Sequence, residues 1–227
     1  MKERILPFSD PDTANYDCPL CHSASPPYAS DNRRNYFQCS ECALVFADPK
    51  SWPSPEKERS EYELHENDAS DPGYRKFLSR VINPLKETLS PDAKGLDFGC
   101  GPGPALSLMM EESGWAMALY DPFFHPNEAA LNERYDFITA TEVIEHIHQP
   151  DIWLPKLWGM VKPGGTLALM TKLVIDQEAF SRWHYKNDPT HVCFYSKDTF
   201  QILADQWGAK LSFEAQDVIF LHKPTQG

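Results

Sequence analysis

Polar and titratable residues are concentrated near the end of the chain, where residues 183–196 read WHYKNDPTHVCFYS. Pro189 excludes a regular helix through the middle of this stretch. A neutral imidazole takes up a proton near neutral pH, so His191, preceded by Asp188, has the type and setting of a general base or a substrate ligand. A lone histidine is also commonly a hydrogen-bonded structural residue, and both interpretations stay open.

Four of the six cysteines occur in two identical pairs, CPLC and CSEC, formed by Cys18 with Cys21 and Cys39 with Cys42. Each pair can direct two thiolates at one ion, and two pairs supply the four sulfur ligands of a closed, structural Zn²⁺ site. The alternatives are two disulfides or four unconnected core cysteines. Short apolar strands on either side of the second pair favour a zinc ribbon.

A glycine-rich turn, GCGPG, follows a short apolar strand at residues 95–98 and precedes a predicted helix. A strand, glycine turn and helix in this order is typical of nucleotide binding, because the ligand can approach the backbone and the helix amino end. The dinucleotide fingerprint fails at the third glycine, Gly103. Asp97 would repel a pyrophosphate but suits a cation such as an amino group. A tight turn without a ligand is the simpler alternative.

Alternating strands and helices must position these groups. Apolar residues at helical spacing predict a helix within residues 74–89, and Ser196 and Gly208 predict the two ends of another. Asp121 ends a predicted strand about twenty residues after the glycine turn, where an acid accepts hydrogen bonds from ribose hydroxyls. The predicted strands are 95–98, 115–121, 135–147 (running into a helix), 161–171, and a terminal hairpin within 210–222.

The phrases D-x-G-x-G-x-G (97–103), TEVIEH (141–146) and P-GG-L-L-T (163–171) resemble class I S-adenosylmethionine-dependent methyltransferases over roughly residues 75–225. The cysteine pairs, YDPF and DPTHV-FYS are similar to a bacterial subgroup with an N-terminal zinc ribbon. The resemblance implies an α/β fold, in which a Rossmann-like methyltransferase sheet with helices on both faces follows a small zinc-ribbon domain. It also implies S-adenosylmethionine as cofactor.

The resemblance further implies which residues bind this cofactor. Asp97 would hold its amino acid portion and Asp121 its ribose. The predicted cofactor-binding residues are Asp97, Phe98, Gly99, Cys100, Gly101, Gly103, Tyr120, Asp121, Pro122, Phe123, Thr141 and Glu142. Only fourteen residues separate Asp121 from Asp136, too few for the usual helix, strand and adenine-contacting acid, so Phe123 or Phe124 is expected to cover the purine.

In such a fold, residues 183–196 lie over the carboxyl ends of the strands, where open α/β sheets bind ligands. His191 and His146 are therefore the leading candidates for a base or acceptor ligand, followed by His184. Glu145, with Glu142, would orient these histidines or cap the following helix.

The composition limits the classes of partner and the cellular locations that are compatible with the sequence. A net charge of −12 makes nonspecific nucleic-acid binding unfavourable, and no apolar run is long enough to span a membrane. The N-terminus, MKERILPFSD, lacks the apolar core of a secretion signal, so we expect a cytoplasmic protein. The predicted units are a zinc-ribbon domain at 1–50, a linker at 51–72 and a methyltransferase domain at 73–227.

The leading hypothesis is therefore an enzyme that methylates a small-molecule acceptor such as a sugar, phenol or quinol. One alternative is an RNA methyltransferase that grips RNA with its ribbon, although Arg33 and Arg34 are among few basic residues there. Another is a non-catalytic module that binds S-adenosylmethionine and docks a protein partner through the ribbon.

Overall fold

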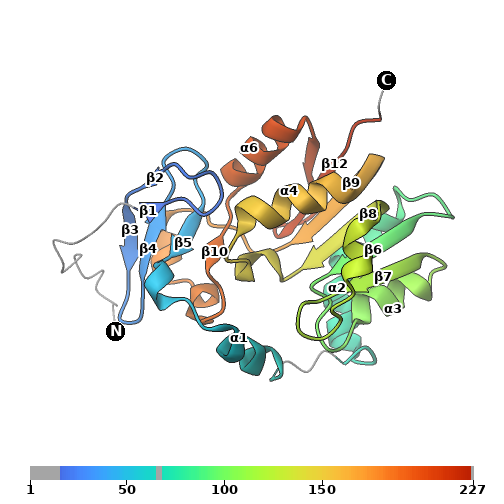
Figure 1. Ribbon diagram of the computed structural model, residues 1–227, viewed down its shortest axis with the longest axis horizontal. Coiled ribbons are helices and arrows are strands. Elements are labelled where there is room, and N and C mark those ends of the chain that lie inside the picture. Colours follow the sequence, from blue (N-terminus) through green and yellow to red (C-terminus); the bar gives the residue numbers. More distant parts are fainter. Residues whose placement is uncertain (1–15, 65–67, 226–227) are drawn as a thin grey trace.

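A computed structural model describes residues 16–64 and 68–225. Its central sheet has the order β11-β12-β9-β8-β6-β7 (Figure 1). Strands β9, β8, β6 and β7 run parallel, and the hairpin β11–β12 lies antiparallel at one edge. The bounds are Lys94–Phe98 (β6), Ala116–Tyr120 (β7), Tyr135–Thr141 (β8), Val161–Met170 (β9), Lys210–Phe213 (β11) and Val218–His222 (β12). The predicted α/β sheet and its terminal hairpin are confirmed.

Helices cover both faces of this sheet, as predicted. Side chains alternate along a strand, so Leu167 and Leu169 of β9 share a core with α4 and α6, whereas Ala168 and Met170 share one with α2 and α3. The same alternation occurs along β12. The helix bounds are Pro72–Lys86 (α2), Ala105–Glu111 (α3), Pro150–Met160 (α4) and Lys197–Trp207 (α6).

The ends of α6 follow the local sequence. Ser196 accepts a hydrogen bond from the Thr199 amide and forms a capping box with it, which begins the helix. Gly208 adopts the left-handed conformation, with φ 61°, and ends it. Both predicted ends are therefore where the sequence placed them.

The segment between β7 and β8 is as short as the sequence indicated. It contains only the 3₁₀ helix η2 (Glu128–Asn132), so β7 is the edge strand of the sheet. Strand β8 ends at Thr141, earlier than predicted, and His146 lies in the 3₁₀ helix η3 (Ile144–His146) that follows. The chain turns sharply at Glu142, whose φ is 53°.

The N-terminal part forms two small antiparallel sheets, β1-β2 and β10-β5-β4-β3. Their bounds are Tyr16–Asp17 (β1), Ala24–Ser25 (β2), Pro27–Ser30 (β3), Asn35–Gln38 (β4), Val45–Ala47 (β5) and Cys193–Phe194 (β10). Strand β10 comes from residues 183–196, so a segment from the C-terminal part of the chain completes an N-terminal sheet (Figure 1). Phe46 and Cys42 also belong to the same core cluster as Leu154 and Phe200. The predicted domain boundaries stay predictions, but the two parts share a core.

Short elements complete the described chain. They are η1 (Pro49–Ser51), α1 (Pro55–Tyr62), α5 (Gln177–Ser181) and η4 (His184–Asn187). Helix η4 ends before Pro189, as the sequence required. The predicted lack of a secretion signal concerns residues 1–10, outside the described residues. Among the described helices, none has the length and apolar character to cross a bilayer.

Candidate functional site

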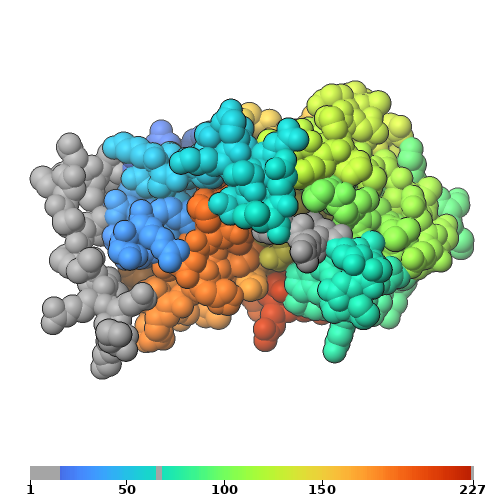
Figure 2. All heavy atoms as spheres, turned by 90° about the horizontal axis from the view of Figure 1, so that it is seen from below, coloured from blue at the N-terminus to red at the C-terminus, as the bar shows by residue number. Residues whose placement is uncertain are grey.

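A cavity of about 590 Å³ opens at the carboxyl ends of β6, β7 and β8. On the face shown in Figure 2, α1 (cyan) lies beside the segment around residues 180–192 (orange), and α2 (teal) lies nearby. All twelve residues predicted to bind the cofactor line this cavity, together with His146 and His191. The structure therefore brings the two predicted groups to one place, while their roles stay predictions.

The glycine turn forms one wall of the cavity. Gly99 and Gly101 have φ values of 74° and 65°, a conformation that side-chain-bearing residues rarely adopt. A Cβ on Gly99 would come within 2.6 Å of the Val143 side chain. The turn is held by the Gly99 amide, which donates to the Tyr120 carbonyl at 2.7 Å. Glycine is thus required here by both conformation and space.

Asp121 links this turn to the segment after β7. Its carboxylate accepts hydrogen bonds from the backbone amides of Gly101 at 3.0 Å, Phe123 at 2.8 Å and Phe124 at 3.0 Å. Both phenylalanines line the cavity, as expected for residues that cover a purine. Asp121 therefore shapes the site in addition to presenting a carboxylate to it.

Asp97 lies at the base of the cavity and is only 4% exposed. Its two oxygens accept hydrogen bonds from the hydroxyls of Ser107 at 3.0 Å and Thr139 at 2.9 Å. Burial raises the pKa of Asp97 to about 6. Each carboxylate oxygen has two lone pairs, so an acceptor position remains for a ligand amino group.

Two polar atoms in the cavity wall have no partner among the described residues. They are the Oγ1 atom of Thr141 and the Oε1 atom of Glu142, both buried. Buried polar atoms are rarely left without hydrogen bonds, so a polar ligand is the natural partner. With the glycine turn and the two aspartates, this wall fits S-adenosylmethionine.

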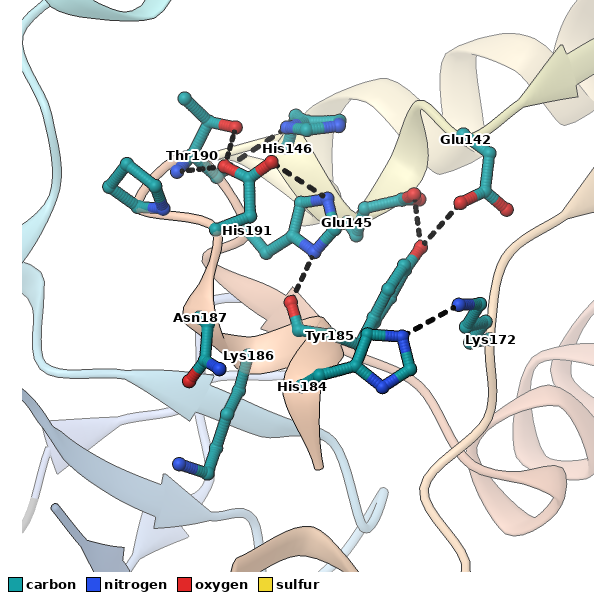
Figure 3. A network of polar contacts seen from close by, with 12 residues as sticks. Glu142, Glu145, His146, Lys172, His184, Tyr185, Lys186, Asn187, Thr190 and His191 are labelled. Carbon is teal, nitrogen blue, oxygen red and sulfur yellow. Dashed lines mark hydrogen bonds and ion pairs between the residues drawn. The ribbon is translucent and has the colours of Figure 1, made fainter. Parts of the chain in front are cut away.

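The two leading histidines, His146 and His191, pack edge to face at the other end of the cavity, with ring centroids 4.6 Å apart (Figure 3). His191 donates from Nδ1 to the Tyr185 carbonyl at 2.7 Å, and His146 donates from Nδ1 to the Thr190 carbonyl at 3.2 Å. Burial lowers the pKa of His191 to about 4, so its imidazole is neutral at pH 7. A neutral imidazole with Nδ1 protonated carries its lone pair on Nε2.

The other two predicted catalytic residues lie outside the cavity lining. Glu145 is fully buried behind the histidines, and burial raises its pKa to about 8. The Tyr185 hydroxyl contacts Glu145 Oε1 and Glu142 Oε2 (Figure 3). His184 is exposed, and its Nε2 lies 3.3 Å from the Lys172 ammonium. The structure therefore separates His184 from the other candidates.

Arg34, from the turn between β3 and β4, holds the segment that carries His191. Its buried guanidinium donates to four backbone carbonyls of residues 186–191. The bonds to the carbonyls of His191 and Asp188 are both 2.9 Å long. Asp31, in the same turn, pairs with the Lys186 ammonium at 2.6 Å. The loop is thus bound to the ribbon by charged groups.

The four cysteine sulfurs of the predicted zinc site lie within 4.8 Å of one another. Cys18 and Cys42 are 3.5 Å apart, and Cys21 and Cys39 are 3.3 Å apart, close to the edge of about 3.8 Å expected for a tetrahedral Zn–S₄ site. Backbone amides donate to the sulfurs of Cys18 and Cys39 at 3.4 Å. His22 and Ala43, which follow the two pairs, share a left-handed conformation. The donor set and its geometry fit zinc.

Sequence reasoning missed Glu58 as part of the cavity. Helix α1 comes from the predicted linker and contributes Glu58, whose Oε1 lies 3.0 Å from His148 Nε2. Tyr62, whose ring packs 5.2 Å from that of His146, also lines the cavity. The high charge of α1 indicated a solvated linker, and no local pattern marks Glu58 as buried.

Comparisons with known proteins identify the family of the larger part of the chain. A family model described as a methyltransferase domain matches residues 72–212. An O-methyltransferase family protein from Burkholderia thailandensis has 10% sequence identity and a TM-score of 0.50, over 75% of this chain and 64% of that one. Magnesium protoporphyrin IX methyltransferase from Synechocystis, solved with bound SAH, has 13% identity and a TM-score of 0.49, over 74% and 93%. No curated protein matches the chain.

We predict that protein prepared without chelator contains one zinc ion per chain. Cys39→Ser should release it, because a closed four-thiolate site loses a ligand. Elemental analysis measures the metal, and Cys100→Ser, which changes a cysteine outside the cluster, is the matched control and should retain it. Zinc-free wild-type protein would contradict the assignment.

We predict that Arg34→Lys lowers the free energy of unfolding by about 2–4 kcal/mol, because one ammonium cannot reach four carbonyls. Arg33→Lys is the matched control. Exposed Arg33 donates to one carbonyl of the same loop, that of Asn187, so its change should cost less than about 0.5 kcal/mol. Urea unfolding measures both, and equal effects would show that Arg34 is not the anchor.

Proposed function

The chain belongs to the family of methyltransferase domains, and from that premise we propose that it transfers a methyl group from S-adenosylmethionine to a hydroxyl of a small molecule. The observation that carries the proposal is the single cavity that joins the glycine turn and Asp121 to His146 and His191. A sugar, a phenol or a quinol has the required hydroxyl.

S-adenosylmethionine supplies, when bound, a methyl group already activated on a sulfonium sulfur. The chain must therefore align the acceptor with the methyl group and remove the proton of the acceptor hydroxyl. Asp97, Asp121 and the glycine turn bind the cofactor at one end of the cavity. His146 and His191, at the other end, bind the acceptor oxygen or take its proton, because both line the cavity and burial keeps the imidazole of His191 neutral.

The walls of the cavity support a small acceptor. Helix α1 covers the end of the cavity that carries His146 and His191, here called the acceptor end, with Glu58 and Tyr62. The histidine loop, residues 183–196, borders it. Trp153 and Phe124 add aromatic surface to the same cavity. Aromatic walls suit a ring-shaped acceptor.

The RNA alternative receives less support. The described part of the ribbon contains two arginines, Arg33 and Arg34. Both donate hydrogen bonds to carbonyls of residues 186–191. These guanidinium groups serve the fold and are not arranged to bind a phosphate backbone. The net charge of −12 also opposes RNA binding. We propose that the zinc-loaded ribbon instead stabilises the acceptor end of the site.

Calorimetry should show that S-adenosylmethionine and its demethylated product bind to one site per chain, whereas NAD⁺ does not bind. We predict that Asp121→Ala weakens this binding at least tenfold, because a carboxylate that accepts ribose hydrogen bonds is worth about 1.5–3 kcal/mol. Asp205→Ala, an exposed aspartate of α6, is the control and should bind normally. Unchanged affinity in Asp121→Ala would remove Asp121 from the site.

The transfer reaction is tested with methyl-labelled S-adenosylmethionine and a panel of sugars, phenols, quinols and RNA. Label should reach a hydroxyl of a small molecule and not RNA. His191→Ala should keep cofactor affinity but transfer methyl groups at least tenfold more slowly, as expected for a positioned histidine. Label on RNA alone would overturn the proposed acceptor class, and wild-type rates in both His191→Ala and His146→Ala would make the histidines structural.

A further inference from the structure

Three residues at the acceptor end have the composition and spacing of a metal site. A ligand atom of Glu145, one of His146 and one of His191 lie within 4.8 Å of one another. Glu145 and His191 are buried, while His146 and His191 line the cavity. Two imidazoles and one carboxylate on one side of an open space leave coordination positions that face the cavity.

The hydrogen bonds of both histidines prepare them as ligands. Each donates from Nδ1 to a backbone carbonyl, that of Tyr185 for His191 and that of Thr190 for His146. Metal-binding histidines commonly donate their other ring N–H in this way, which fixes the tautomer and the ring orientation. The Thr190 carbonyl lies within residues 186–191, which Arg34 holds, and the Tyr185 carbonyl directly precedes them, so the orientation of both rings is built into the fold.

The carboxylate of Glu145 is incompletely satisfied by the protein. Its Oε1 contacts the Tyr185 hydroxyl, whereas the buried Oε2 has no hydrogen-bond partner among the described residues. Glu145 is 0% exposed, so its carboxylate does not lie at the protein surface. A buried carboxylate oxygen in this position calls for a proton or a cation.

We propose that Glu145, His146 and His191 bind a divalent cation whose open positions face the cavity. The mixed nitrogen and oxygen donors suit Mn²⁺, Fe²⁺, Co²⁺ or Zn²⁺ and distinguish this site from the four thiolates of the ribbon. The cation would hold the oxygen of a hydroxyl-bearing acceptor at the wall opposite the cofactor. This last step rests on the proposed function, whereas the metal site itself does not.

Zinc-loaded full-length protein is titrated with Mn²⁺ in the absence of cofactor and acceptor, and free Mn²⁺ is measured by electron paramagnetic resonance. Mn²⁺ favours nitrogen and oxygen donors and should leave the thiolate site intact. We expect one Mn²⁺ per chain, with affinity reduced at least tenfold in Glu145→Gln and in His146→Asn. His184→Ala, an exposed histidine on the neighbouring turn, is the control and should bind like wild type.

Wild-type protein that binds no Mn²⁺ at millimolar concentration would overturn the proposal. Equal affinity in wild type and Glu145→Gln would also overturn it, because the carboxylate would then contribute nothing. Glu145→Gln keeps the shape of the side chain, and unfolding curves verify that each variant is folded. Failure of this titration leaves cofactor binding and methyl transfer unaffected, so it is distinguishable from failure of the proposed function.

Discussion

The guanidinium of Arg34 is the constraint on which the end of the cavity that carries His146 and His191 depends. Arg34 is 8% exposed, and its guanidinium binds four backbone carbonyl oxygens between residues 186 and 191. A segment of such irregular backbone would otherwise have unpaired carbonyls inside the protein. The planar, permanently charged guanidinium has several N–H donors and can pair with all of these carbonyls at once. A lysine ammonium could not do so. The histidine loop therefore takes its shape from an N-terminal residue.

This constraint gives the ribbon a role in the site. The cysteine cluster orders β4 and β5, the turn after β3 presents Arg34, and β5 pairs with β10 directly after His191. The Ala47 amide donates to the Val192 carbonyl, and the Val192 amide donates to the Glu145 carbonyl, at 2.9 and 2.8 Å. A continuous path of hydrogen bonds thus runs from the ribbon to η3. The small unit and the larger one form a single site-bearing structure.

Local patterns in the sequence were sufficient to predict the α/β sheet, the cysteine cluster and the glycine turn. The cysteine spacing, the glycine turn and the Ser196 and Gly208 helix ends each depend on neighbours close in the chain, so their interpretation carried over to the structure. Arg34 and Glu58 could not be recognised in the same way, because their partners lie ninety or more residues away in the chain. Each stands in a charged segment that is typical of an exposed loop. Only tertiary structure shows that they are buried.

Hydrogen exchange at the Val192 amide tests the central claim most directly, since this amide lies between the ribbon and the candidate site. It should be measured in zinc-loaded protein and after removal of zinc by a chelator. The account predicts at least tenfold faster exchange at Val192 after zinc removal, while amides of β9 and β12 exchange as before. Unchanged protection of Val192 in a protein whose β4 and β5 amides have become exposed would contradict it.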